Sequence, residues 1–207
     1  MKHARSHYAE GLLFLTVLVI ALAVGLRYMT NRKTATNSSK QVAQTTQELP
    51  YPTATANSQF ISQIANPAIA IYQKSPRILP SIVIGQAILE SNFGTSKLYL
   101  DANNPFGVKG TYNGSSVVFQ TLENINGKNV YQSANFRKYP TVKDAVDDYY
   151  QVVSQKFITQ DNIQSYRRLA EMLQNNGYAT DPNYAKKLIR TIVKYNLSKY
   201  DIEAINQ

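Results

Sequence analysis

The sequence has no cysteine and no tryptophan, and its only two histidines, His3 and His7, lie at the extreme N-terminus. Both histidines precede any segment with the composition of a folded domain. Catalysis by cysteine or histidine is therefore excluded, and so is an ordinary zinc site, whose ligands are mainly Cys and His. We expect no metal and no organic cofactor. Carboxylates, hydroxyls, amides and tyrosines remain as the groups that carry chemistry.

Acidic residues are scarce: 13 Asp and Glu stand against 22 Lys and Arg, which gives a net charge of +9 and a pI near 9.6. Such a balance indicates attraction to an anionic polymer, with nucleic acid and a cell wall as the candidates. No run of Lys or Arg resembles a nucleic-acid-binding arm, and Arg167-Arg168 and Lys186-Lys187 have the pattern of solvated helix faces. We therefore expect no nucleic-acid partner.

Residues 1–33 contain the single long apolar run of the chain. Lys2 and Arg5 precede 16 uncharged, mainly apolar residues at positions 11–26, and Arg27 ends the run. At 1.5 Å per residue a helix of this length spans about 24 Å, which fits a signal peptide or a membrane anchor. Ala21-Leu22-Ala23 resembles a cleavage site, but apolar residues continue beyond it. An uncleaved N-terminal transmembrane anchor is therefore favoured over a removed signal.

The segment 34–57 has the composition of a disordered linker. It is rich in Thr, Ser, Gln, Asn and Ala, contains two prolines, and has few large apolar residues, so it lacks the surface to form a core. Residues 58–207 remain, and about 150 residues are enough for one domain with a proper core. We expect this domain to be monomeric.

Periodic apolar positions and start signals predict five helices in this domain. Their predicted ranges are 59–74 with an interruption near Pro67, 80–90 opened by Pro80, a third beginning at the capping box of Thr141 and Asp144, 163–176, and 181–195. Gly177 is the expected C-cap of the fourth helix and Asp181 the expected N-cap of the fifth. Two Asn-Gly pairs, at 113–114 and 126–127, separate short runs typical of strands and predict a small antiparallel meander. The fold class is α+β, mainly α, with a small β-hairpin lobe.

Glu90 is the strongest candidate for a catalytic group. It ends the apolar run 81–89 and is followed at once by Ser91-Asn92-Phe93-Gly94. The macrodipole disfavours a carboxylate at a helix C-terminus, so a glutamate there needs some compensation. Half-apolar surroundings raise the pKa of a carboxyl group, which is what a general acid requires near neutral pH.

Four segments in this order resemble the bacterial endo-β-N-acetylglucosaminidases of glycoside hydrolase family 73. They are Pro80 to Gly94, Asn104-Pro105-Phe106-Gly107-Val108-Lys109-Gly110, Phe136-Arg137-Lys138-Tyr139-Pro140 and Gly177-Tyr178-Ala179-Thr180-Asp181-Pro182. The resemblance covers roughly residues 60–194. It implies a lysozyme-like fold that faces a β lobe across a groove, and hydrolysis of peptidoglycan glycan strands.

By this resemblance Glu90 is the general acid. Glu123, the only acid on the predicted meander, corresponds to a second carboxylate that activates water or stabilises an oxocarbenium-like transition state, as glycoside hydrolysis usually requires. Asp101 is the alternative, although its segment also has the pattern of a turn.

The resemblance also implies which residues bind the sugar. Tyr178 and Tyr139 stand where the family keeps tyrosines near the groove. Asn104 and Phe106 lie in the segment that lines the groove, although a turn and core packing explain this segment equally well. For Phe106, packing is favoured over stacking on sugar. Arg137 is either a partner for a carboxylate in the groove or a solvated strand-end residue.

The resemblance implies an enzyme that cuts the β-1,4 bond between N-acetylglucosamine and N-acetylmuramic acid. A muramidase or a lytic transglycosylase of the same fold remains an alternative, and so does a non-catalytic wall-binding module. The expected location is the outer face of the cell membrane, or the cell wall if the signal is cleaved.

Overall fold

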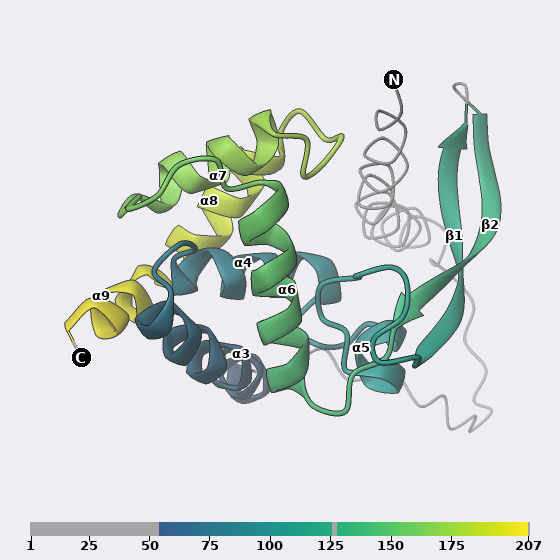
Figure 1. Ribbon diagram of the computed structural model, residues 1–207, viewed down its shortest axis with the longest axis horizontal. Coiled ribbons are helices and arrows are strands. Elements are labelled where there is room, and N and C mark those ends of the chain that lie inside the picture. Colours follow the sequence, from purple (N-terminus) through teal and green to yellow (C-terminus); the bar gives the residue numbers. More distant parts are fainter. Residues whose placement is uncertain (1–53, 126–127, 207) are drawn as a thin grey trace, which may run out of the picture.

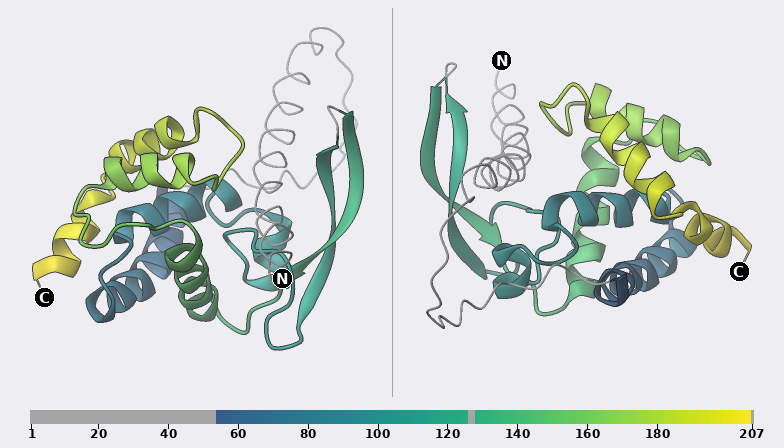
Figure 2. Two further views of the ribbon diagram at one scale, coloured as in Figure 1. Left: turned by 45° about the horizontal axis from the view of Figure 1, so that its top comes forward. Right: turned by 180° about the vertical axis from the view of Figure 1, so that it is seen from behind.

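The computed structural model describes residues 54–125 and 128–206, which form a helical body with a two-stranded β-hairpin beside it (Figure 1). The elements are α3 (Ala54–Lys74), α4 (Pro80–Ser91), α5 (Lys97–Ala102), β1 (Ser116–Ile125), β2 (Lys128–Arg137), α6 (Val142–Lys156), α7 (Tyr166–Asn175), α8 (Tyr184–Lys194) and α9 (Ser198–Asn206). The mainly helical class with a small antiparallel lobe is thereby confirmed. Figure 2 shows from two more directions that the hairpin stands apart from the helices, with α5 at its base.

The predicted membrane anchor lies outside the described residues, and so does the predicted linker as far as position 53. Among the helices that the structure describes, none is both long enough and apolar enough to cross a membrane.

Helix α4 is the centre of the body, because every residue from Pro80 to Ile88 is buried. A helix that is apolar on all sides has to be surrounded by other elements, and α4 packs against α3, α7, α8 and α9. Pro80 occupies its first turn, as predicted. The backbone N–H of Ser81 donates to Oδ1 of Asp201 on α9 at 2.7 Å. A buried carboxylate from the C-terminal helix therefore holds the start of α4.

Helix α3 corrects two expectations. It begins at Ala54, so the last four residues of the predicted linker are helical, and it continues through Pro67 without interruption. An interior proline costs about 3 kcal/mol. Burial of Ile64, Ala65, Ala68 and Ile69 on either side of the proline outweighs this cost and keeps the helix continuous.

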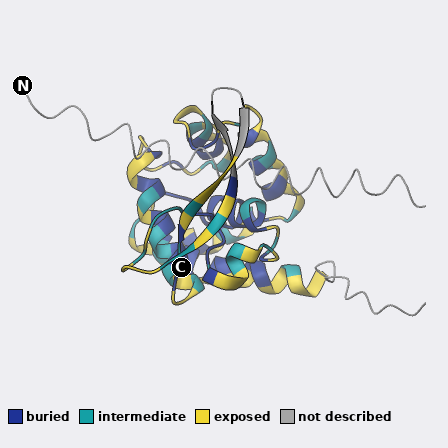
Figure 3. Ribbon diagram, turned by 90° about the vertical axis from the view of Figure 1, so that its right-hand side faces the viewer, coloured by how far each residue is buried: buried dark blue, intermediate teal, exposed yellow. Residues whose placement is uncertain are grey.

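The β lobe is a single antiparallel hairpin rather than a meander. Its register runs from Ser116 opposite Arg137 to Ile125 opposite Lys128. Asn113-Gly114 forms a separate tight turn with φ of +48° and +79°, closed by reciprocal backbone hydrogen bonds of 3.0 and 2.8 Å between the flanking residues. The chain before that turn makes isolated bridges only. Figure 3 shows that the hairpin carries mostly exposed and intermediate residues, whereas the helices hold the core.

The remaining helices follow the sequence more closely. The capping box is confirmed, because Thr141 and Asp144 exchange side-chain and backbone hydrogen bonds at the start of α6. The next two helices begin about three residues later than predicted, α7 at Tyr166 and α8 at Tyr184. The expectation that Asp181 caps α8 is corrected: Asn183 holds the cap position, and Asp181 accepts from its N–H at 2.9 Å. Helices α5 and α9 were not predicted.

Candidate active site

Glu90 lies in the last turn of α4, at the end of the central buried helix. Its side chain as a whole is partly exposed, but its Oε2 atom is buried and has no hydrogen-bond partner among the described residues. Burial raises the pKa of Glu90 to about 8. The carboxyl group is therefore mainly protonated at neutral pH, and the environment predicted for it from the sequence is confirmed.

A sharp left-handed turn fixes the position of Glu90. Asn92, Phe93 and Gly94 have φ of +49°, +57° and +73° in succession. The Ser91 hydroxyl donates to the Ala87 carbonyl at 2.6 Å and accepts from the Gly94 N–H at 2.9 Å. A Cβ on Gly94 would lie 2.6 Å from the ring of Phe60. Only glycine satisfies both the positive φ and this close approach, so the chain leaves α4 in one direction.

A cluster of three phenols and one amide lies around Glu90. Burial is the main cause of the raised pKa of Tyr149, Tyr178 and Tyr184, and the charge of Glu90 adds to each shift. Gln86, one turn before Glu90, accepts from the Tyr149 hydroxyl through Oε1 and donates to the Tyr184 hydroxyl through Nε2 at 2.8 Å. The acid is therefore bordered by polar groups that helices α4, α6 and α8 and the α7–α8 connection contribute.

The amide of Gln86 gives this cluster a direction. A glutamine side chain offers an acceptor at Oε1 and donors at Nε2. Because Nε2 donates to Tyr184, the Tyr184 proton is directed to the next hydroxyl, that of Tyr178, with which it is hydrogen-bonded. Tyr178 is also hydrogen-bonded to Tyr149, whose own proton goes to Gln86, so Tyr178 donates to Tyr149. The four groups therefore form a closed ring of hydrogen bonds, which holds Tyr178 beside the acid.

Tyr178 reaches this place through the end of α7. Gly177 has φ of +79°, and the Tyr178 N–H donates to the Leu173 carbonyl at 2.9 Å. Its ring meets the edge of Phe157 at a centroid distance of 5.3 Å and lies 5.2 Å from the ring of Tyr184. Gly177 is thus the C-terminal glycine that the sequence predicted, and it brings Tyr178 into the cluster.

Asn104 and Phe106 support the site from behind. The Asn104 amide donates to the carbonyls of Val108 and Arg137 at 3.0 and 2.9 Å and accepts from the Val108 N–H at 3.0 Å. Phe106 is 1% exposed and is stacked on Tyr149 at 3.8 Å between centroids. The expectation that these two residues bind sugar is not supported, because the amide groups are already paired and the ring is covered.

Tyr139 joins the β lobe to α6. It is buried, and its hydroxyl donates to Asp148 at 2.6 Å, while Arg137 contacts both oxygens of the same carboxylate at 2.6 Å. Arg137 therefore does pair with an acid, and that acid is Asp148. The expected contact of Tyr139 with sugar is not supported by this geometry, since its hydroxyl is committed to Asp148.

The two candidates for a second carboxylate lie on different elements. Glu123 is on β1, with its backbone opposite Val130 of β2, and its side chain lies outside what the structure describes. Asp101 is exposed in the last turn of α5 and forms an ion pair with Lys97. Asp101 and Ala102 are therefore the last residues of α5, and Asn103 ends the helix in the left-handed conformation. Asp101 is not among the buried groups around Glu90.

Comparisons with known proteins agree with this architecture. Residues 65–197 match the family model described as mannosyl-glycoprotein endo-beta-N-acetylglucosaminidase. The chain belongs to this family. It is 42% identical to Exo-glucosaminidase LytG of Bacillus subtilis (strain 168) over 149 residues, which cover 69% of this chain and 52% of that protein. It is 36% identical to a probable N-acetylmuramidase of Lactococcus lactis subsp. lactis (strain IL1403), with coverages of 81% and 40%.

The similarity extends to solved glucosaminidase-family structures. The catalytic domain of the autolysin Auto from Listeria monocytogenes superimposes with a TM-score of 0.64 at 32% identity, covering 84% of this chain and 96% of that domain. The chain spans about half or less of the length of the two curated relatives.

Four residues of the family domain escaped the sequence analysis: Gln86, Tyr149, Tyr184 and Asp148. The first had a detectable signal, because a lone amide in an otherwise apolar buried run, four residues before the acid, has to find internal partners. Tyr149 has the spacing of a core residue on its helix, so the sequence pattern indicated packing and no role in the site. Tyr184 and Asp148 had no local signal, since their partners lie on other elements.

Within residues 54–125 and 128–206 no group of three or more His, Cys, Asp or Glu side chains is placed to hold a metal ion.

Proposed function

We propose that the chain hydrolyses peptidoglycan at the β-1,4 bond between N-acetylglucosamine and N-acetylmuramic acid, with Glu90 as the general acid. One observation carries the proposal: a carboxyl group whose buried oxygen has no partner, and whose pKa is about 8, at the end of the central helix. A protonated carboxyl group there can donate to the glycosidic oxygen as the bond breaks. Membership of the glucosaminidase family supports this choice of bond.

Glu123 is proposed as the second carboxylate. It lies on the β lobe, which stands apart from the helical body that holds Glu90 (Figure 1). Carboxylates on opposite sides of a sugar ring are the usual arrangement for activating water or stabilising an oxocarbenium-like transition state. Asp101 is the less favoured choice, because its carboxylate pairs with Lys97 on its own helix.

Tyr178 is proposed as the phenol that contacts either the acid or the acetamido group of the substrate. Its support is its place beside the acid, since the charge of Glu90 adds to the raised pKa of its hydroxyl. No cofactor and no nucleic acid enter this proposal.

Muramidase and lytic transglycosylase activities are the rival assignments. A relative named as a probable N-acetylmuramidase favours considering the first. A transglycosylase works with a single carboxylate, so an active Glu123→Gln variant would favour the second.

We also propose that a monomeric catalytic domain is held outside the cell membrane by residues 11–26, with the linker providing reach. The apolar run supports the anchor, and the polar composition of the linker that follows supports the outer side of the membrane. Membrane fractionation of cells that express the full chain tests it: release of the protein into the medium with a shortened N-terminus would mean a cleaved signal.

Mass spectrometry of borohydride-reduced fragments tests the bond that is cut. Peptidoglycan is digested with the full chain, with Glu90→Gln as the matched control. Reduced N-acetylglucosamine ends that are absent in the control support the proposal. Reduced muramic acid ends would mean a muramidase, anhydro ends a transglycosylase, and firm binding without any fragments a wall-binding module.

A further inference from the structure

The positive charge of the domain is concentrated on one part of it. Between Tyr166 and Lys199 there are seven Lys and Arg but only two Asp and Glu, a net charge of +5. From Ala54 to the end of the chain there are 16 basic and 11 acidic residues, which is also +5. The rest of the domain is therefore electrically balanced, and its whole excess lies on α7, α8 and the start of α9.

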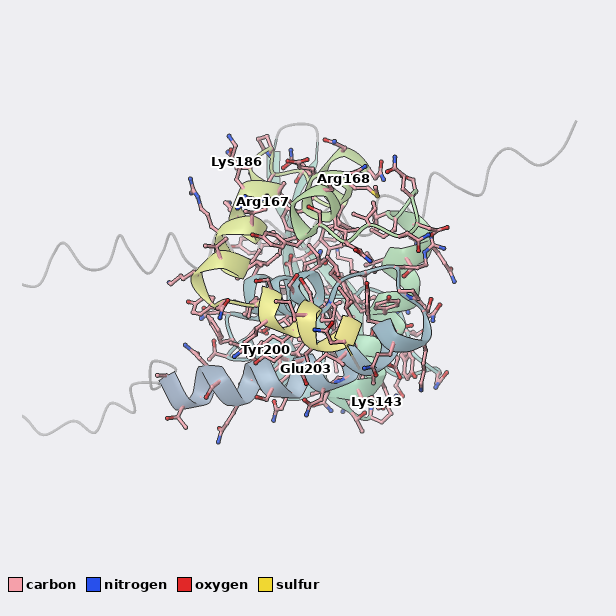
Figure 4. The ribbon with its side chains drawn as sticks, turned by 90° about the vertical axis from the view of Figure 1, so that its left-hand side faces the viewer. Lys143, Arg167, Arg168, Lys186, Tyr200 and Glu203 are labelled. Carbon is pink, nitrogen blue, oxygen red and sulfur yellow. The ribbon has the colours of Figure 1, made fainter. Side chains whose placement is uncertain are left out.

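Three of these cations form a stripe along α8. Lys186, Arg190 and Lys194 follow one another at intervals of four residues, so they share one helix face over about 12 Å. All three are exposed, opposite the buried face of the helix, which is formed by Tyr184, Ala185, Leu188, Thr191 and Ile192. We call these three residues the α8 stripe. Figure 4 shows Lys186 at one end of this side of the molecule together with Arg167 and Arg168 of α7, away from Glu203.

The stripe lacks the acids that neutralise lysines elsewhere in the chain. Lys97 with Asp101 and Lys143 with Asp147 form ion pairs between residues four apart on their helices. In the described part of the chain no ion pair involves any of the three stripe residues. Like charges four residues apart on a helix repel each other and destabilise it. The α8 stripe therefore carries a repulsion that an external anion would relieve.

The rings beside this face argue against nucleic acid as that anion. Tyr166, Tyr195 and Tyr200 are partly buried, and each has a cation of this chain over its ring at 4.9–5.4 Å. Single-stranded nucleic acids are held by bases that stack on accessible aromatic side chains. A polymer that offers charge without bases suits this face better.

We propose that the α8 stripe, with Arg167 and Arg168, binds a linear polymer of the cell wall whose repeats are joined by phosphodiester groups. The choice of a wall polymer depends on the proposed function. Tyr184, in the first turn of α8, belongs to the cluster around Glu90, whereas the stripe lies on the outer face of the same helix. A polymer bound there holds the domain on the wall without occupying the acid.

The test compares two triple variants of the full chain. Lys186→Gln/Arg190→Gln/Lys194→Gln removes the stripe, and Lys74→Gln/Lys138→Gln/Lys156→Gln removes the same charge from exposed positions elsewhere. Binding is measured by co-sedimentation with walls that retain their phosphodiester polymer and with walls stripped of it by hydrofluoric acid. Release of reducing ends from stripped walls is measured in parallel.

Wild type and the control variant should bind the polymer-bearing walls more tightly than stripped walls. Three released counterions predict a loss of about 20- to 40-fold in affinity between 50 and 200 mM salt. The stripe variant should lose most of that preference and most of the salt dependence, while its rate on stripped walls stays unchanged. Stripe-variant binding equal to that of the control would overturn the proposal. So would equal binding of wild type to both walls, or equally effective competition by single-stranded DNA or anionic lipid vesicles. If wild type releases no fragments from any wall, the proposed function fails, and the binding comparison still decides the stripe.

Discussion

At the scale of single residues, the site depends on one carboxyl group kept neutral by its surroundings. Glu90 lies at the end of the central helix, where one of its carboxyl oxygens is buried and has no hydrogen-bond partner among the described residues. The left-handed turn that follows fixes the backbone beside it. The phenols around it stay protonated near neutral pH, since burial raises the pKa of each above the ordinary value of 10.0. Glu90, with a pKa of about 8, is therefore the group of this cluster that titrates nearest to neutral pH.

The pH dependence of catalysis follows from this. Glu90 has to be protonated to donate, so kcat is expected to fall as the pH rises through about 8, the pKa of its carboxyl group. Glu90→Gln should lower kcat by about 10²–10⁴-fold below pH 8, because an amide is not acidic enough to give a proton to the leaving oxygen. A pH profile of reducing-end release checks both. An alkaline limb that persists in Glu90→Gln would assign the titration to another group.

The same group makes stability depend on pH. Its pKa is about 8 in the folded chain against an ordinary value of 4.5, so between these values the folded state binds more protons than the unfolded state. Stability contributed by protonated Glu90 is present below that window and is lost as the pH rises through it. Glu90→Gln should remove this slope. Above pH 8 it should raise the free energy of unfolding by a few kcal/mol, at about 1.4 kcal/mol per pKa unit, and the Tm with it. Thermal melts of both proteins at several pH values measure it.

Gln86 is expected to act through the tyrosines as a positioning residue. Gln86→Leu removes both hydrogen bonds and should lower kcat by about 10²-fold with little change in KM, because a displaced donor costs orientation. Gln86→Glu places a negative charge beside Glu90, which raises the pKa of the acid and moves the alkaline limb to higher pH. Unchanged pH profiles in both variants would leave Gln86 a packing role only.

At the scale of elements, α4 is held at both ends by groups far away in the sequence. The turn at Gly94 packs on Phe60 of α3, and the first turn of the helix receives the Asp201 carboxylate from α9. Burial raises the pKa of Asp201 to about 6, although its hydrogen bonds with Ser81 oppose the shift. The C-terminal helix therefore helps to place the start of the helix whose other end carries the acid.

Asp201→Ala is expected to cost about 1–2 kcal/mol of stability, because it removes the acceptor for the Ser81 N–H at the helix start. Asp201→Asn keeps an acceptor oxygen and should recover most of that loss. Stability contributed by the protonated form of Asp201 is lost as the pH rises from about 4 to 6, and the asparagine variant should lack this slope. Urea unfolding at pH 4.5 and 7 measures these differences. Equal stability of the alanine variant and wild type would show that water replaces the carboxylate.

At the scale of the whole molecule, two parts have to keep a fixed relation for a two-carboxylate reaction. The hairpin stands apart from the helical body (Figures 1 and 2). One link at its base is the Asp148 carboxylate of α6, held by Arg137 and Tyr139. This ion pair is partly buried, with side chains that are 16% and 25% exposed. It is therefore worth more than a surface pair.

Asp148→Asn should cost about 1–3 kcal/mol and lower kcat, since Arg137 keeps its charge without a full counter-charge and the lobe is held less firmly. Asp147→Asn is the matched control, because Asp147 pairs only with the exposed Lys143 and should cost less than about 0.5 kcal/mol. Chemical denaturation and reducing-end assays compare the two. Equal effects at both positions would mean that the link at Asp148 has no special role.

The sequence by itself predicted the class of candidate catalytic group and most of the local structure. The absence of cysteine and the N-terminal placement of both histidines indicated a carboxylate as the candidate acid. The apolar run before Glu90 predicted both its helix and its raised pKa. The capping box at Thr141 and the glycine at position 177 are likewise local signals, because a cap or a left-handed residue is decided within a few neighbours.

Only the tertiary structure decided what surrounds the acid. The glutamine-tyrosine cluster, the carboxylate of Asp201 and the link at Asp148 join segments 60 to 120 residues apart or different elements, and periodicity carries no information about such pairs. The family motif predicts sugar contacts for Asn104, Phe106 and Tyr139, because a motif indicates which residues belong to a site. Burial decides which of these residues can face the substrate, and all three are buried. Tertiary packing also decided the course of the backbone at Pro67. Burial of the residues on both sides of this proline outweighed its local preference to break the helix.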